Sequence, residues 1–428
     1  MRQLAFHLLP LILIGALPSP QSTAAPAHGA SAIRYEGAKV WTGQAFRQAD
    51  LTVVDGRFVR QAPRGAKLRT VDVRGAYIVP AYANAHAHVT NATEETSQAF
   101  LESGIFYVWN PNTVVQGDAA RAFYARANTY DVKVSQGGIT EPGGHPEKLY
   151  VDVLSQYVYP GREREWFLGN AFHYGRTPSE ISAALDTLVE QRADFVKAYL
   201  VHSDEYAKRR DDPSFHGSKG LNPANLPFLV QQATKRGLEV VAHIDTVPDL
   251  LTAAKAGVAI AGHLPGYGGG TAPVYRLDRQ QAEQVVRSDI GLIPTYSVAA
   301  ARFAEAAERG TPDPKQTASY ALQKHNLSEL KRAGGTFLMG TDGRGPIFEE
   351  AEHWVELGAF SSLEAARIVF ATGKRLFPGR RIGCFQAGCE ADFLILAADP
   401  TSDIRNLRRI TSAIKAGAAV WSRHSADR

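Results

Sequence analysis

The sequence lacks the features that mark several broad classes of protein. Only 44% of its 428 residues are apolar, which is too low for a protein with many membrane spans. Its formal charge is only +4, and no run of lysine or arginine dominates any stretch, so we expect no nucleic-acid partner. The chain has two cysteines, and no further cysteine or histidine lies beside them, which argues against a zinc site built on this pair.

Those two cysteines, Cys384 and Cys389, flank a short stretch that is typical of a hairpin turn. In an oxidising compartment they could form a disulfide across the turn. Two free thiols are an equal alternative, because the geometry of paired strands often fails the distance that a disulfide requires.

The longest apolar run lies near the N-terminus. Met1-Arg2 gives a short positive start, Leu4–Leu17 is apolar but too short to span a bilayer comfortably, and small residues follow at 23–27. This layout predicts a cleaved signal peptide over residues 1–27, and therefore an exported protein, periplasmic or secreted, with no stable membrane anchor after cleavage. An uncleaved anchor helix is the alternative. No cysteine follows the run and no twin-arginine pair is present, which argues against a lipoprotein and against twin-arginine export.

Two kinds of pattern divide the rest of the chain. Residues 28–77 alternate between apolar and polar side chains, with a tight-turn signal at Asp55-Gly56, and residues 381–428 return to this β character. Between them, over residues 78–380, eight short apolar runs alternate with helical stretches. We therefore predict an α/β fold, with a TIM-like (β/α)8 barrel over 78–380 and a small composite β-sandwich formed by both chain ends, 28–77 and 381–428. The eight runs are Ile78–Ala85, Ile105–Trp109, Val132–Ser135, Phe195–Leu200, Leu238–Ala242, Val258–Ala261, Gly291–Pro294 and Thr336–Met339.

A pair of histidines closes the first apolar run. His86 and His88 are two residues apart, so on a strand both side chains point to the same side. At the C-terminal end of a barrel strand, where barrel active sites form, both imidazoles can face the barrel axis. Two surface histidines are the alternative explanation.

Lys197 lies inside the apolar run of the fourth predicted strand. A buried lysine is costly as a cation, and burial lowers its pKa, so the neutral amine becomes available for reaction. A neutral lysine can take up carbon dioxide and become a carbamate, an anionic oxygen ligand able to bridge two metal ions. The alternative is a lysine whose amine reaches the rim of the barrel.

His243, His263 and Asp342 end the fifth, sixth and eighth runs. Each alone could be an ordinary polar residue at a strand end. Together with the His86 pair and Lys197 they form a set of polar residues on five strands, all at C-terminal ends, and such a set predicts a metal site.

This order of residues resembles the binuclear amidohydrolases. The flanking segments agree, at Asp55-Gly56-Arg57, Thr341-Asp342-Gly343 and Arg381-Ile382-Gly383, and the resemblance covers nearly everything after about residue 33. It is closest to the subgroup with imidazolonepropionase-like and Xaa-Pro dipeptidase-like members that use a carboxylated lysine. Ala81 and Asn84 depart from the family pattern, which usually has Gly and Asp there, but neither position is a ligand in the family.

The resemblance implies a ligand set and a reaction. His86, His88 and Asp342 would hold one divalent metal ion, His243 and His263 a second, and N6-carboxylated Lys197 would bridge both. The implied activity is hydrolysis of an amide-type C–N bond, in a cyclic amide or a small peptide, by a metal-bridged hydroxide with Asp342 as general acid and base. Imidazole and carboxylate ligands suit zinc without excluding manganese, iron or cobalt.

Three further residues are candidate contacts for a small-molecule substrate. Arg344 could clamp a carboxylate, Tyr267 follows His263 and could hydrogen-bond the substrate, and His145 lies in the long Gly- and Pro-rich connection over residues 136–166. A surface arginine and a structural turn around His145 are the plainer readings. We interpret His202 and His216 as bystanders.

Other functions remain open from the sequence alone. The same site could open lactones or cleave phosphotriesters, and a mononuclear deaminase would leave Lys197 unmodified. A non-catalytic metal- or solute-binding barrel is a third class, against which the intact ligand set with Asp342 argues. The sequence also leaves a homo-oligomer open.

Overall fold

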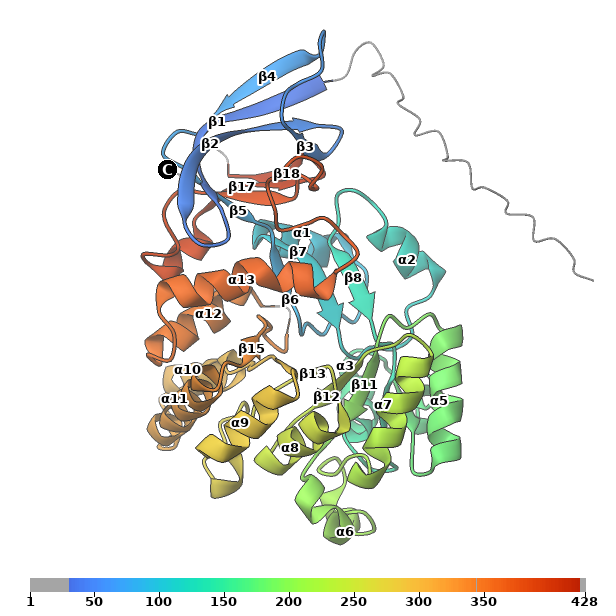
Figure 1. Cartoon of the computed structure of the whole chain (residues 1–428). Helices are drawn as coiled ribbons and strands as arrows, with labels where there is room; N and C mark the ends of the chain where they lie inside the picture. Colours follow the sequence, from blue (N-terminus) through green and yellow to red (C-terminus); the bar gives the residue numbers. More distant parts are fainter. Residues whose placement is uncertain (1–30, 344, 424–428) are drawn as a thin grey trace, which may run out of the picture.

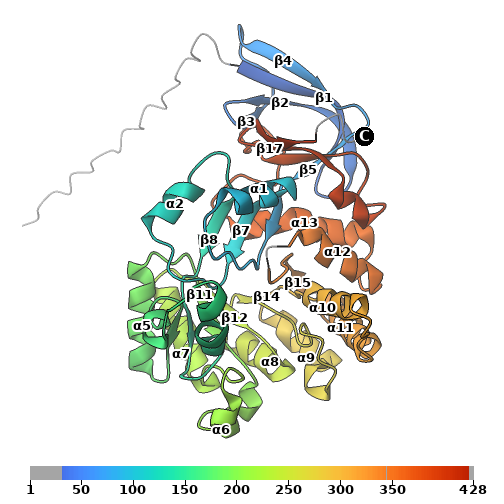
Figure 2. The same cartoon turned by 180° about the vertical axis from the view of Figure 1, so that it is seen from behind.

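The computed structural model describes residues 31–343 and 345–423. In this part of the chain the fold is α/β, with one mixed sheet and two parallel sheets. Figures 1 and 2 show the mixed sheet at one end of the molecule and the helices arranged around the parallel strands. The predicted signal peptide, residues 1–27, lies outside the described residues. None of the described helices combines the length and apolar character that crossing a membrane requires.

The mixed sheet joins strands from both ends of the described chain. Its order is β18-β17-β16-β5-β1-β2-β3, and β4 pairs with β1. Strand β5 lies parallel to β1 on one side and antiparallel to β16 on the other. The two ends therefore share one sheet, while a two-layer sandwich stays a prediction. The strands are β1 (Ser31–Trp41), β2 (Phe46–Val54), β3 (Arg57–Val59), β4 (Lys67–Asp72), β5 (Tyr77–Pro80), β16 (Phe393–Leu396), β17 (Ile410–Lys415) and β18 (Ala418–Ser422).

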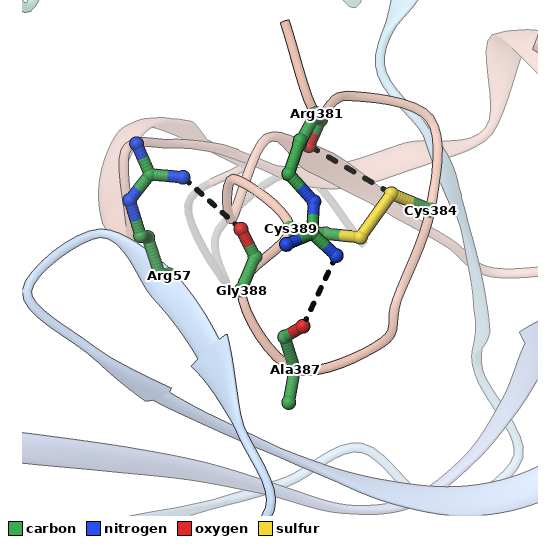
Figure 3. The surroundings of a disulfide bond; sticks show 6 residues. All are labelled: Arg57, Arg381, Cys384, Ala387, Gly388 and Cys389. Carbon is green, nitrogen blue, oxygen red and sulfur yellow. Dashed lines mark hydrogen bonds between the residues drawn. A yellow bond between two sulfur atoms is a disulfide. The ribbon is translucent and has the colours of Figure 1, made fainter. Parts of the chain in front are cut away.

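The two cysteines form a disulfide within the loop that precedes β16, with their Cα atoms 5.9 Å apart (Figure 3). This loop docks on β3. The amide of Gly388 donates to the carbonyl of Phe58 over 2.8 Å, and the amide of Phe58 donates to the carbonyl of Cys389 over 2.9 Å. The Arg57 guanidinium also donates to the Gly388 carbonyl over 3.0 Å. Of the two states that the sequence left open, the structure has the bonded one.

The parallel strands form two ladders, of three and seven strands. Every one of the eight predicted runs overlaps a strand, but the first run divides at Ala81 between β5 of the mixed sheet and β6. Strand β9 lies in the stretch predicted as a long connection, and Gln136, with φ of 59°, separates it from β8. The three-stranded ladder contains β6 (Tyr82–Asn84), β7 (Ile105–Asn110) and β8 (Asp131–Val134). The seven-stranded ladder, in the order β10-β9-β11-β12-β13-β14-β15, contains β9 (Gly138–Thr140), β10 (Phe172–Tyr174), β11 (Val196–Tyr199), β12 (Val240–His243), β13 (Ile260–Ala261), β14 (Gly291–Leu292) and β15 (Thr336–Phe337).

Single backbone hydrogen bonds cross between these two ladders. The amide of Ala85, just after β6, donates to the carbonyl of Met339, just after β15, over 2.8 Å. The amide of Asp194, before β11, donates to the carbonyl of Val134 in β8 over the same distance. The strand ends of both ladders therefore approach one another, whereas a closed eight-stranded barrel stays a prediction.

The helices follow the strands and cover them. In helix α8 the local sequence determines both ends: Thr246 and Asp249 form a capping box at its start, and Gly257 ends it with φ of 79°. A large apolar cluster fills the space between the helices and the parallel strands, and a smaller one lies against the mixed sheet. The helices are α1 (Glu94–Glu102), α2 (Asp118–Tyr124), α3 (Ser155–Tyr157), α4 (Arg164–Phe167), α5 (Pro178–Glu190), α6 (Tyr206–Arg209), α7 (Leu226–Lys235), α8 (Val247–Ala256), α9 (Arg279–Arg287), α10 (Ser297–Glu308), α11 (Gln316–Arg332), α12 (Ile347–Glu356) and α13 (Ser362–Leu376), with a π-helical turn at Leu149–Leu154.

Candidate metal centre

Three histidines and one carboxylate meet where β6, β13 and β15 end. The Nε2 atoms of His86 and His88 are 3.3 Å apart, and each lies 3.2 Å from the same carboxylate oxygen of Asp342. His263 brings its Nε2 atom within 4.0 Å of that oxygen. His86 and His263 are fully buried, while His88 is partly exposed. Strands distant in sequence thus deliver four potential metal ligands to one point.

Asn84 fixes the two segments that carry this cluster. Its side-chain oxygen accepts hydrogen bonds from the amides of His86, over 3.0 Å, and Thr341, over 3.3 Å. Its side-chain amide donates to the Thr341 hydroxyl over 2.8 Å. Asp342, which follows Thr341 in the chain, has φ of 56°, a left-handed conformation that aspartate adopts more readily than most residues. Asn84 therefore orients both His86 and Asp342, although the sequence marked it only as a departure from the family pattern.

Lys197 lies beside the cluster on β11 and is 1% exposed. Its amine has no hydrogen-bond partner among the described residues, and burial lowers the pKa of Lys197 to about 7. The amine lies close to the backbone of Gly262. A Cβ atom added to this glycine would lie 2.9 Å from Lys197 Nζ and 3.1 Å from Cε1 of His86. The structure thus brings an amine with a depressed pKa and no partner against the imidazole cluster.

His243 ends β12 on the other side of His263, with the two ring centroids 4.7 Å apart. In the structure its Nε2 atom contacts a carboxylate oxygen of Asp245 over 3.1 Å. Sequence reasoning did not select Asp245 as a site residue, although a carboxylate two residues after a histidine at a strand end indicates a possible partner for that histidine.

Two of the three predicted substrate contacts, His145 and Tyr267, lie beside the histidines of the site. The His145 ring packs 4.8 Å from the His243 ring, and the Tyr267 ring stacks 4.1 Å from that of His263. Arg344 lies outside the described residues. The two predicted bystanders have other neighbours: His216 contacts Asp152 at 3.6 Å, and the His202 ring lies 6.5 Å from that of Tyr275.

The Nδ1 atoms of His88 and His263, which do not face the cluster, have partners of their own. His88 donates from Nδ1 to the carbonyl of Asn112 over 3.1 Å. Nδ1 of His263 lies within hydrogen-bond distance, 2.8 Å, of the Thr295 hydroxyl. Contacts of this kind set the ring orientation and leave Nε2 directed at the centre, as is common for metal-binding histidines.

The electrostatics favour neutral imidazoles around an ionised carboxylate. Burial, followed by the nearby Lys197, lowers the pKa of His86 to about 3, and burial holds the pKa of His263 well below its usual value. Burial alone would raise the pKa of Asp342, but the neighbouring His263, His86 and His88 hold it well below its usual range. At neutral pH the group offers lone pairs and negative charge, which is the donor set that divalent ions require.

These residues fit a metal ion on two structural grounds. The ligand atoms of His86, His263 and Asp342 all lie within 4.8 Å of one another. Within the part of the chain that the structure describes, the buried amine of Lys197 and the buried Nδ1 of His86 have no hydrogen-bond partner, which is costly unless another group occupies the site.

The cluster opens into a pocket of about 430 Å³. Besides the cluster, its walls include residues that sequence reasoning did not select, among them Leu149, Leu154 and Arg302. A pocket of this size accommodates a small molecule rather than a polymer.

Comparison with known proteins gives a curated relative and several similar solved structures. No family model matches the chain. The ochratoxinase of Aspergillus niger is 26% identical over 287 residues, which cover 64% of this chain and 56% of the fungal protein, so the match spans little more than half of that relative's length.

The crystal structure of A. niger ochratoxinase superposes with a TM-score of 0.69, at 19% identity, over 92% of this chain and 96% of that one. A prolidase complexed with N-methylphosphonate-L-proline gives 0.68, at 17% identity, over 92% and 100% of the two chains. Molinate hydrolase gives 0.68, at 16% identity, over 91% and 94%. At such identities the likeness establishes the fold. The structural neighbours are amidohydrolases and ochratoxinase is a sequence homologue, as the resemblance predicted.

Proposed function

We propose, from the premise that this chain shares its fold with the amidohydrolases, that it is a metal-dependent hydrolase of an amide-type C–N bond in a small molecule. The convergence of His86, His88, His263 and Asp342 beside the buried Lys197 carries the proposal. The relatives support the reaction class, since ochratoxinase, a prolidase and molinate hydrolase are all hydrolytic enzymes.

The residues divide into two sets of metal ligands in this proposal. His86, His88 and Asp342 would hold one divalent ion and His243 and His263 a second, with zinc as the ion that best suits these donors. Lys197 would bridge the two as a carbamate: its neutral amine forms a bond to the carbon of carbon dioxide, and a proton leaves. Ions bound here would supply Lewis acidity and lower the pKa of water.

Asp342 would move the proton during hydrolysis. Its depressed pKa keeps the carboxylate ionised at neutral pH, so it can accept a proton from the water that attacks the amide carbonyl. The same oxygen would then deliver that proton to the leaving nitrogen. His145 and Tyr267, which flank the His243 and His263 rings, would contact the substrate.

Metal analysis tests the proposal first. Wild-type protein purified with bicarbonate is expected to contain about two divalent ions per chain, and Lys197→Ala fewer, with turnover of Xaa-Pro dipeptides or N-acyl amino acids lost in parallel. His325→Gln is a matched control, because His325 lies on α11 and contacts Arg276 rather than the cluster. Asp342→Asn should abolish turnover. One ion or none in the wild type, unchanged by Lys197→Ala, would exclude the bridged pair.

Two finer proposals concern the whole chain. We propose that the two parallel ladders act as one (β/α)8 barrel, and that residues 1–27 are removed on export. Mass spectrometry of the mature N-terminus after expression with the native leader tests the second proposal, and an intact Met1 in an exported product would refute it.

A further inference from the structure

Exposed apolar side chains gather in one segment of the protein. Among the described residues, seven large apolar side chains are exposed, and five of them lie within residues 149–168. Three of these five are spaced four residues apart: Leu149, Val153 and Tyr157, at 41%, 43% and 79% exposure. Apolar side chains gathered in this way mark an interaction surface, whereas scattered ones carry no such meaning.

Leu149, Val153 and Tyr157 lie on one face of a helical segment. The π-helical turn Leu149–Leu154 continues without a break into α3, Ser155–Tyr157. Side chains four residues apart in a helix lie one above the other, so these three form an apolar stripe. The stripe starts at the rim of the pocket, because Leu149 is also one of the residues that line it.

The opposite face of the same segment is anchored to the body of the protein. Tyr150 is buried, and its hydroxyl accepts a hydrogen bond from the side-chain amide of Asn112 over 2.8 Å. The stripe is therefore held on a fixed element, and a fixed apolar surface loses little conformational entropy when a partner covers it. The anchor is a small apolar cluster, separate from the main core, that consists of Tyr150, Phe167, Ala171 and Phe172.

The charges around the stripe decide which partner fits. Residues 148–168 carry three cationic and three anionic side chains: Lys148, Arg162 and Arg164, and Asp152, Glu163 and Glu165. Arg164 already pairs with the buried Glu147 over 2.9 Å, so the segment has no excess of positive charge. Attraction to an anionic lipid surface needs such an excess. Both signs in equal number, alternating over residues 162–165, instead match a second copy of the same surface related by a twofold axis.

We propose that the protein forms a twofold-symmetric dimer in which the stripe of one copy packs antiparallel on the stripe of the other. The middle residue, Val153, then faces its own counterpart at the axis, and Leu149 faces the partner's Tyr157. Tyr157 supplies the large aromatic anchor of the contact, and the charged side chains of residues 148–168 form its polar rim. The inference goes beyond the proposed reaction and does not depend on it.

Sedimentation equilibrium of the whole protein tests the pairing. The wild type should have twice the mass of one chain. Val153→Asp places two like charges together at the axis and should raise the dissociation constant of the dimer by about 100-fold or more. Val189→Asp is the matched control, because Val189 is a valine of similar exposure, 45%, near the end of α5, and it should leave the dimer unchanged.

Charge complementation separates a broken contact from a broken fold. Val153→Lys alone should also be monomeric, and both variants should keep the circular dichroism spectrum of the wild type because position 153 is exposed. An equal mixture of Val153→Asp and Val153→Lys should form a heterodimer, since opposite charges then meet at the axis. A mixture that stays monomeric would overturn the antiparallel arrangement and with it the inference.

Two further results would also overturn the inference. One is a wild-type protein with the mass of a single chain at every concentration up to about 100 μM, where even a weak specific dimer forms. The other is a dimer that Val153→Asp leaves intact, because another surface then forms the contact. Flotation with vesicles of phosphatidylglycerol and phosphatidylethanolamine tests the lipid alternative: a monomeric wild type that floats with the vesicles, and a Val153→Asp variant that does not, would assign the stripe to a membrane surface instead.

Discussion

Gly262 is the position where one added methyl group should damage the centre most. It is buried directly before His263, and its amide donates to the Ala242 carbonyl of β12 over 2.7 Å. An added Cβ would lie 2.9 Å from Lys197 Nζ, 3.0 Å from the Ala242 carbonyl oxygen and 3.1 Å from Cε1 of His86. Its backbone conformation is one that alanine can adopt, so the clash is the main cost of Gly262→Ala.

The loss of stability in Gly262→Ala depends on how far the atoms around the added Cβ can move. The Ala242 oxygen belongs to a strand and has little freedom, and Lys197 is 1% exposed, so its amine must shift within a packed interior. Overpacking of this kind costs about 1–3 kcal/mol of unfolding free energy. The displaced amine would no longer reach its place beside His86, so we expect metal content to fall from about two ions per chain toward one.

Metal analysis and thermal unfolding of the same sample measure both effects. Gly379→Ala is the matched control, because a Cβ there meets no atom within 4 Å. Gly262→Ala should lose metal and melt a few degrees lower, while Gly379→Ala should match the wild type. If Gly262→Ala keeps the wild-type melting temperature and metal content, the amine of Lys197 is not confined as the structure describes, and the reasoning fails.

Three further changes test other parts of the structure. Burial lowers the pKa of His353 to about 4, so the unfolded chain takes up this proton more readily, and His353 alone should contribute about 1–2 kcal/mol to the unfolding free energy lost between pH 7 and pH 5. Urea unfolding measures this loss, which should shrink in His353→Gln; an equal loss in the variant would contradict it. Replacing Cys384 and Cys389 with serine should cost at most about 2 kcal/mol, because the closed loop is short, and should leave metal content unchanged. A larger cost in urea unfolding, or a loss of metal, would show that the disulfide loop supports more than the edge of β3. Asn84→Ala removes the hydrogen bonds that join the His86 segment to Thr341, and should weaken metal affinity roughly 10–100-fold in competition with a chelator; unchanged affinity would show that Asn84 does not orient the cluster.

The cluster was accessible to sequence reasoning because of a general property of parallel strands. Polar residues placed directly after short apolar runs arrive at the same edge, since the C-terminal ends of parallel strands lie together. His86 and Asp342 are far apart in the chain, yet this rule alone predicts that they approach, and the structure has them 3.2 Å apart. Helix α8 has start and stop signals of a local kind, the capping box of Thr246 and Asp249 and the terminal Gly257.

What the sequence could not supply depends on contacts between distant segments. Arg302 and Arg309 occupy the same helical stretch, and nothing local distinguishes the residue that lines the pocket from the one that pairs with Glu305. The role of Asn84 depends on where Thr341 lies in space. The division of the first apolar run at Ala81 depends on β16, which takes β5 into another sheet.

That pairing of β5 with β16 has a consequence for how the chain is made. Pro80 of β5 faces Phe393 of β16, which a ribosome adds more than 300 residues later. During synthesis Ile78 and Val79, which are buried in the folded protein, therefore remain without strand β16 until it has been translated. Closing the long loop between β5 and β16 is then slow. The nascent chain carries an open, apolar strand edge until nearly all of it has been translated, so the yield of folded protein should depend on chaperones or low temperature more than its final stability suggests.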